Sequence, residues 1–138
     1  MRLLAGRLRA AWSRDDGSAA AEFVLVGTLL TVLTLSVIQL GLALHIRNTL
    51  LDAAAEGARF AALADNRLGD GVLRATDLIE AALGPGYAQD VSVSRKSYLG
   101  HPSAIVTVRA PLPLIGLIGI EGGLEVVGHA AIETLDWR

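Results

Sequence analysis

An uncharged run from Phe23 to Leu44 is the feature that most constrains what this chain can fold into. The run reads FVLVGTLLTVLTLSVIQLGLAL and is interrupted only by Gly, Thr, Ser and Gln. As a helix rising about 1.5 Å per residue it extends roughly 33 Å, against about 30 Å of hydrocarbon in a bilayer. It therefore predicts a slightly tilted transmembrane helix, which we place at residues 18–46. The alternative is a buried core helix, which is less favoured because 138 residues leave little to cover a helix that is apolar on all sides.

The arginines predict how this helix is oriented. Four of them precede the run, whereas only Arg47 and Arg59 follow it closely; the four are Arg2, Arg7, Arg9 and Arg14. Positive residues stay on the cytoplasmic side of a membrane. We therefore expect a plasma-membrane protein that crosses the bilayer once. Its parts are a basic cytoplasmic leader (1–17), the transmembrane helix (18–46) and an extracytoplasmic α+β domain (47–138).

Small residues continue the helical pattern beyond the apolar run. Ala53, Gly57 and Ala61 recur every four residues, and residues 54, 58 and 62 repeat the spacing with alanine. Small side chains at this spacing let another helix or a sheet approach closely, so they predict a packing face. The alternative is that an Ala-rich stretch is simply a good helix former. On another flank, Glu56 and Arg59 are spaced to form an i,i+3 ion pair.

The rest of the chain predicts a second helix and a short antiparallel sheet, which makes the fold class α+β. Apolar residues at helical spacing indicate a helix, and a later change to a period of two indicates strands. We expect a turn at Asn66–Gly71, a helix at Val72–Leu83, a strand from Val91 to Tyr98, a turn at Leu99–Ser103, a strand at Ala104–Ala110 that ends at Pro111, and a strand at Leu124–Leu135. In the last strand, Glu125 and His129 should share one face and Val126 and Ala130 the other.

The segment Leu112–Ile120 reads as a loop because of its Pro and Gly residues, yet it is almost entirely apolar. Loops normally carry polar groups to solvent. Three placements fit such a loop: beneath the sheet, on the membrane surface, or against a neighbouring subunit.

Nothing in the sequence predicts an enzyme, a metal site or a cofactor. The three histidines are scattered without the HExxH spacing of zinc proteases, no serine lies in a GxSxG motif, and the chain has no Cys. A net charge of −2 gives no reason to expect a nucleic-acid partner. We therefore expect no catalytic residues, no bound metal and no cofactor.

Glu22 is the residue that most suggests a function. An ionisable group beside a transmembrane helix is a functional candidate by default. The alternative is an acid in the first helical turn, favoured by the helix dipole. A capping box does not explain it, because with Ser18 as the N-cap the third helical position is Ala21.

The residues around Glu22 resemble the class III/IV signal of prepilins. Gly17-Ser18-Ala19-Ala20-Ala21-Glu22-Phe23 follows a short basic leader and precedes the apolar run. In prepilins a membrane aspartyl protease, the prepilin peptidase, cuts after the Gly, and the fifth residue of the mature chain is Glu. The resemblance implies a cut between Gly17 and Ser18. An ordinary secretory signal is cut after its apolar segment, whereas this cut would leave the apolar helix in the mature protein.

The wider sequence is similar to TadE-like minor pseudopilins of the tight-adherence (Flp) pilus system, over roughly residues 15–64. The segments Asp16–Phe23 and Leu50–Ala62 carry the resemblance, and Gly27 departs from it because bulkier residues or Pro are common there in the family. It implies a type IV pilin-like fold and a role for Glu22 and Phe23 in subunit register and assembly. The implied partners are the bilayer, the prepilin peptidase, other pilin and pseudopilin subunits, and the pilus assembly platform. Chain length does not separate TadE-like from TadF-like proteins, and an uncleaved single-pass envelope anchor or scaffold is the alternative function.

Overall fold

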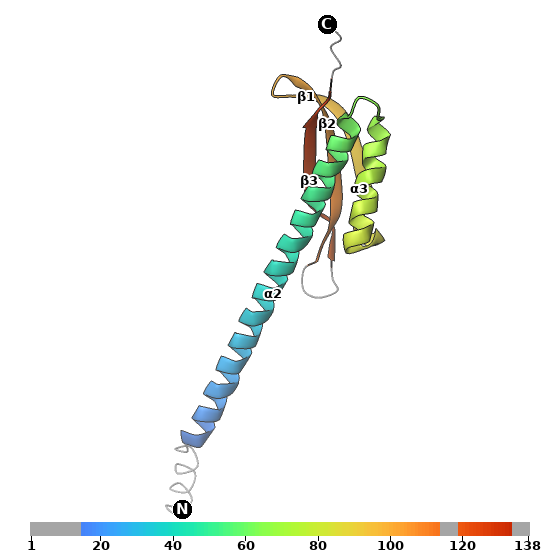
Figure 1. The fold of residues 1–138 in the computed structure, drawn as a ribbon. Coiled ribbons are helices and arrows are strands. Elements are labelled where there is room, and N and C mark those ends of the chain that lie inside the picture. The colour runs from blue at the N-terminus through green and yellow to red at the C-terminus, as the bar shows by residue number, and fades with distance from the viewer. Residues whose placement is uncertain (1–14, 114–118, 134–138) are drawn as a thin grey trace, which may run out of the picture. The chain divides into compact units, whose positions relative to one another are not determined.

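A computed structural model of the chain describes residues 15–113 and 119–133, and it confirms the α+β class (Figure 1). The elements in chain order are α2 (Asp15–Ala62), α3 (Leu68–Leu83), the short 3₁₀ helix η1 (Pro85–Tyr87), β1 (Asp90–Tyr98), β2 (His101–Pro113) and β3 (Gly119–Ala131). Residues 1–14 of the expected leader and residues 114–118 of the expected apolar loop lie outside the described residues. Two compact units divide the chain, Met1–Ile38 and Gln39–Arg138, and the second is called the C-terminal unit below.

Helix α2 is an unbroken helix of 48 residues that contributes to both units. Its described part already includes Asp15, so Ser18 lies inside the helix and is not its N-cap. The last carbonyls of the helix have partners outside it. The amide of Glu133 donates to the carbonyl of Ala62 at 3.0 Å, and the Asn66 side chain donates to the carbonyl of Phe60 at 2.8 Å. These bonds satisfy orphan groups at the helix end, and one of them ties that end to the residues after β3.

The three strands form an antiparallel sheet in the order β1-β2-β3. The predicted division of β3 into two faces is confirmed: Val126 is buried, whereas Glu125 and His129 are exposed. Residues opposite one another in register share a face, so the buried Val106 and Val108 of β2 lie on the same face of the sheet as Val126.

A charged row crosses the exposed face of the sheet. Arg109 of β2 lies opposite Asp90 of β1 and Glu125 of β3. Its Nε donates to Glu125 at 2.7 Å, and its Nη1 lies 3.7 Å from an Asp90 oxygen. The hydrogen bond to Glu125 and the negative charges of both acids raise the pKa of Arg109. Since these side chains are about half exposed, the row favours the observed register more than it stabilises the fold.

Strand β2 is longer than predicted at both ends. The expected turn at Leu99–Ser103 is wrong, because only Leu99 and Gly100 form the turn and the strand begins at His101. At the other end Pro111 does not stop the strand. The register shifts between Ala110 and Leu112, and this irregularity accommodates a residue that has no N–H to donate.

Strand β3 is likewise displaced from its predicted position. It begins at Gly119, not Leu124, and ends at Ala131, not Leu135. Leu112 pairs with Ile120 across the two strands, so both ends of the expected apolar loop belong to the sheet. The many Gly residues of this region obscured the strand, because glycine has low strand propensity.

Helix α3 begins four residues before its predicted start at Val72, and the turn expected at Asn66–Gly71 is wrong. The amide of Arg67 donates to the Asp70 carboxylate at 2.8 Å, which satisfies a backbone group at the helix start. The two glycines that suggested a turn lie inside the helix, at residues 69 and 71. Gly71 is buried against α2, so tertiary packing outweighs its low helix propensity.

Helices α2 and α3 cover one face of the sheet and enclose the core of the C-terminal unit (Figure 1). The largest fully buried side chains are Leu50 of α2, Ile79 of α3, and Val106 and Val108 of β2. Much of the remaining core is alanine, so the elements approach one another closely. The closest approach is at Gly128 of β3, where a Cβ atom would overlap the backbone of Ala54 and Ala55.

This approach predicts that Gly128→Ala destabilises the fold. A Cβ at residue 128 meets backbone that cannot rotate away, so α2 must move off the sheet, at a cost of about 1–3 kcal/mol. Urea unfolding of the full chain in detergent micelles, followed by far-UV circular dichroism, measures the change. Gly86→Ala is the matched control, because nothing lies within 4 Å of a Cβ there. Equal unfolding midpoints for the two variants would contradict the packing.

Candidate functional site

Gly17 and Ser18 lie in exposed helical backbone near the described start of α2. Nothing lies within 4 Å of a Cβ built at Gly17, so no packing contact requires glycine there. Glycine inside a helix is about 0.8–1.0 kcal/mol less favourable than alanine. The peptide bond between these two residues is therefore solvent-accessible and lies at a point where the helix is intrinsically weak.

Glu22 lies one helical turn after Ser18, and both side chains are exposed. The Ser18 hydroxyl donates to a Glu22 carboxylate oxygen at 3.3 Å. Within residues 15–113 and 119–133 Glu22 forms no salt bridge. Phe23, the next residue, is 80% exposed. The site predicted around Glu22 is thus an open surface of one helix, with a carboxylate and an aromatic ring side by side in the sequence.

The apolar run after Glu22 is exposed on every side, which is incompatible with the buried core helix considered as an alternative. The large apolar side chains from Phe23 to Leu44 are about half exposed or more. In the described part of the chain, α2 is the one helix that is long and apolar enough to cross a membrane. Such a surface is stable only in an apolar environment, such as a bilayer or other apolar helices.

The hydroxyl groups of the run are satisfied within the helix, a feature that sequence reasoning missed. Thr28, Thr31, Thr34 and Ser36 each donate to the carbonyl four residues earlier at 2.8 Å. An unpaired hydroxyl in hydrocarbon costs free energy. Because these hydroxyls are paired, the Thr and Ser residues of the run do not oppose insertion. The predicted helix could have indicated these hydrogen bonds, since Ser and Thr inside helices commonly donate to the i−4 carbonyl.

The structure places Ala53, Gly57 and Ala61, the residues of the predicted packing face, in the buried surface of α2. A Cβ at Gly57 would lie 2.6 Å from the carbonyl oxygen of Gly71 and 2.8 Å from the Cβ of Ala75. The two helices therefore meet backbone to backbone at Gly57 and Gly71. Sequence reasoning missed Gly71 as the partner because it placed that residue in a turn.

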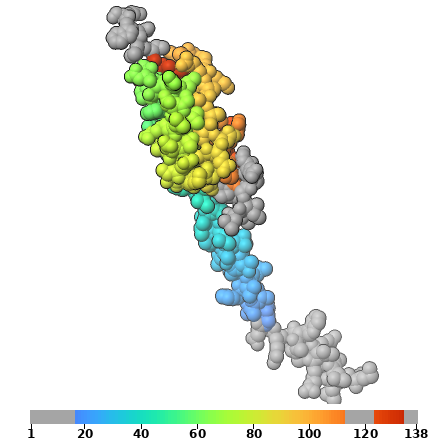
Figure 2. All heavy atoms as spheres, turned by 90° about the vertical axis from the view of Figure 1, so that its right-hand side faces the viewer, coloured from blue at the N-terminus to red at the C-terminus, as the bar shows by residue number. Residues whose placement is uncertain are grey.

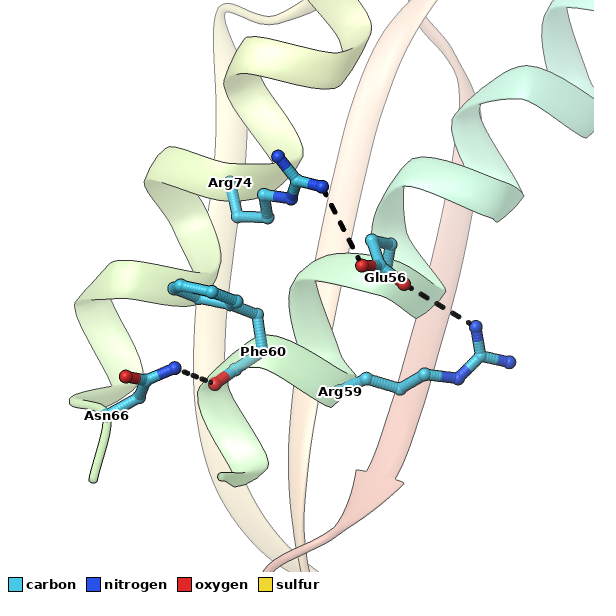
Figure 3. A network of polar contacts seen from close by, with 5 residues as sticks. All are labelled: Glu56, Arg59, Phe60, Asn66 and Arg74. Carbon is cyan, nitrogen blue, oxygen red and sulfur yellow. Dashed lines mark hydrogen bonds and ion pairs between the residues drawn. The ribbon is translucent and has the colours of Figure 1, made fainter. Parts of the chain in front are cut away.

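A small charged network lies beside this helix crossing (Figure 3). Glu56 is 3.7 Å from Arg59, the pair that its spacing predicts, and 3.9 Å from Arg74 of α3. All three side chains are at least two-fifths exposed, so each pair contributes at most about 1 kcal/mol. The network joins α2 to α3 without forming a buried polar site.

The described residues contain no group of three or more His, Asp and Glu side chains placed to hold a metal ion. His129 of β3 stacks on Tyr98 of β1, with ring centroids 4.1 Å apart. Both residues are exposed on the outer face of the sheet. The stack is a contact between the two edge strands, and it presents no nucleophile or paired acid.

Comparison with known proteins gives a family match over the same part of α2. No curated protein and no solved structure matches the chain. The family model described as TadE-like protein matches residues 17–59. These residues include Gly17, Ser18, Glu22, the whole exposed apolar run and most of the buried small-residue face of α2. Over residues 17–59, the chain is similar to TadE-like proteins.

Proposed function

We propose that this chain is a pseudopilin-like membrane subunit that takes part in assembling a tight-adherence (Flp) pilus. The observation that carries the proposal is that one helix combines an exposed apolar span, a carboxylate at the start of that span, and a family match over the same residues. The span anchors the subunit in the plasma membrane, with residues 1–17 in the cytoplasm and residues 47–138 outside. Its role is structural, with no chemical reaction of its own.

In this proposal a prepilin peptidase removes the leader by cutting between Gly17 and Ser18. Glycine before the cut supports the step, because it lowers the cost of opening the exposed helix for a protease. The cut frees an α-amine on Ser18, with a reference pKa of about 7.7–8.0, one turn from Glu22. A cation and a carboxylate then lie together at the cytoplasmic edge of the span.

Glu22 sets the axial register between subunits by pairing with the freed amine of a neighbour. A charge in the apolar interior is costly, and pairing offsets that cost. The exposure of Glu22 supports this role, since its carboxylate is open to another chain. Phe23 beside it supplies an exposed ring for the same contact. The partners are other pilin and pseudopilin subunits and the assembly platform.

Cleavage is tested by the intact mass of native protein extracted from membranes of cells that contain the peptidase. We expect a chain that begins at Ser18 and lacks residues 1–17. Gly17→Leu should leave the leader attached, because a bulky side chain replaces the glycine at the cut. A full-length native chain in those cells would remove the pseudopilin proposal and favour the uncleaved envelope anchor.

The register role predicts that Glu22→Ala damages assembly while leaving insertion and cleavage largely intact. Removing the Glu22 charge beside the span makes membrane insertion easier. In assembly, however, the freed α-amine of a neighbouring subunit loses its anionic partner. Losing one member of a buried pair costs about 3–5 kcal/mol, and partial exposure reduces that cost. Glu22→Asp should fall between, because the charge remains on a shorter side chain.

Co-purification with other pilus subunits, with surface pili counted in parallel, measures this effect. Glu80→Ala is the matched control, since it removes an exposed carboxylate from α3. If the Glu22→Ala chain assembles like the control, the register role is wrong. Glu22 is then only an acid that the helix dipole favours at the start of the span.

A further inference from the structure

Strands β2 and β3 continue past β1 as a two-stranded ribbon. Among the described residues, the last pair between β1 and β2 is Asp90 with Arg109, whereas β2 and β3 pair as far as Pro113 with Gly119. Residues 110–113 of β2 therefore extend past β1, by about 13 Å at the usual rise of a strand. We call the described part of this ribbon, residues 110–113 and 119–124, the β2–β3 extension.

The sequence of the β2–β3 extension is apolar toward its end. No charged residue lies between Arg109 and Glu121. Leu112 pairs with Ile120 there, and Leu112 is only partly buried although two helices cover the neighbouring part of the sheet. The two prolines of β2, at residues 111 and 113, have no N–H, so this end of the ribbon has fewer backbone donors that need a partner. An uncharged, apolar segment with few open donors is better suited to an apolar environment than to water.

The β2–β3 extension lies at the end of the C-terminal unit from which α2 departs. Ile46, the first buried residue of α2, belongs to the same core cluster as Ala110 of β2. Ala62, the last residue of α2, belongs to a second cluster with Ala104, near the start of β2. Strand β2 therefore runs antiparallel to α2 and ends on the side of the apolar run. In Figure 2, α2 likewise leaves the unit at its yellow end, where α3 finishes.

The extension is long enough to reach the level at which the apolar run ends. Gly128, which lies opposite Val106 in the sheet, packs directly on Ala54 of α2. From this contact Leu112 lies six residues further along β2, or about 20 Å. Leu44, the last residue of the apolar run, lies ten residues before Ala54 on the helix, or about 15 Å, and it belongs to the C-terminal unit as well. The end of the extension is thus level with the end of the proposed membrane span.

We propose that the end of the β2–β3 extension, around Leu112 and Ile120, contacts lipid at the extracytoplasmic surface of the bilayer that α2 crosses. The partner is identified by level and by chemistry. A chain held by the apolar run brings the extension to the membrane surface, and an uncharged segment gains free energy by leaving water there. The contact gives the C-terminal unit a second attachment to the membrane, which restricts its tilt about the end of the span. The inference rests on the proposed span of α2, but not on leader cleavage or pilus assembly.

Fluorescence quenching by nitroxide-bearing lipids tests the contact, because a chain without Cys can be labelled at single positions. Full-length Leu112→Cys and Ile120→Cys chains carry a fluorophore in phosphatidylcholine vesicles, with or without lipids that bear a nitroxide near the headgroup. We expect the nitroxide to quench both labels several-fold more than a label at Gly86→Cys. Gly86 is the matched control, because it is exposed, has open space around a Cβ and lies at the same end of the unit, where Tyr87 packs on the cluster of Ile46. Far-UV circular dichroism of each labelled chain checks that it is folded.

A label at Leu30→Cys, quenched by nitroxides deep in the acyl chains, separates this inference from the proposed span. Strong quenching at Leu30 with weak quenching at Leu112, Ile120 and Gly86 alike would overturn the inference alone, because the extension would then face water or a neighbouring subunit. Equally strong quenching at Gly86 and in the extension would also overturn it, because the whole end of the unit would then meet the lipid. Absence of quenching at Leu30 would overturn the span and, with it, the inference. A defect in pilus assembly with the expected quenching pattern would count against the proposed function alone.

Discussion

Close backbone packing of α2 against its neighbours is the constraint on which the C-terminal unit depends. At Gly57 the helix meets Gly71 of α3, and at Ala54 it meets Gly128 of β3, in each case with no room for another Cβ. Core residues are accordingly small, with alanines on two adjacent stripes of α2. A core of this kind gains less from burying large side chains and more from many short-range contacts between backbones. That explains how a chain with few aromatic residues folds a layer of two helices on three strands.

The two parts of α2 differ in the exposure of their apolar side chains. Up to Leu44 its apolar side chains are exposed all round, whereas from Ile46 onward one side of it is buried against the sheet and α3. The change in composition from Leu and Val to Ala and Gly marks this transition in the sequence. In the proposed subunit the first part lies in the bilayer and the second organises the exported unit. Glu22 lies at the start of the first part, more than 20 residues before Ile46, the first buried residue of the second part.

Sequence reasoning predicted the features that depend on local pattern. The long helix, the small-residue face and the face alternation of β3 follow from periodicities that backbone geometry imposes. The errors fell where tertiary contacts outweigh propensity: Gly71 lies in a helix because it packs on Gly57, and Pro111 lies in a strand because a register irregularity accommodates it. The positive φ of Leu99 in the turn between β1 and β2 was beyond prediction, since it depends on a backbone dihedral angle that no local pattern specifies.

The central claim is that α2 is one helix with a lipid-exposed first part and a protein-packed second part. Site-directed spin labels on the Cys-free full chain in bilayers test it most directly, through collision rates with oxygen and with a water-soluble relaxing agent. Labels at Leu29, Leu30 and Leu35, which point to different sides of the helix, should all contact oxygen and not the water-soluble agent. A label at the exposed Asp52 should show the reverse. Water contact at all three positions of the span would contradict the claim.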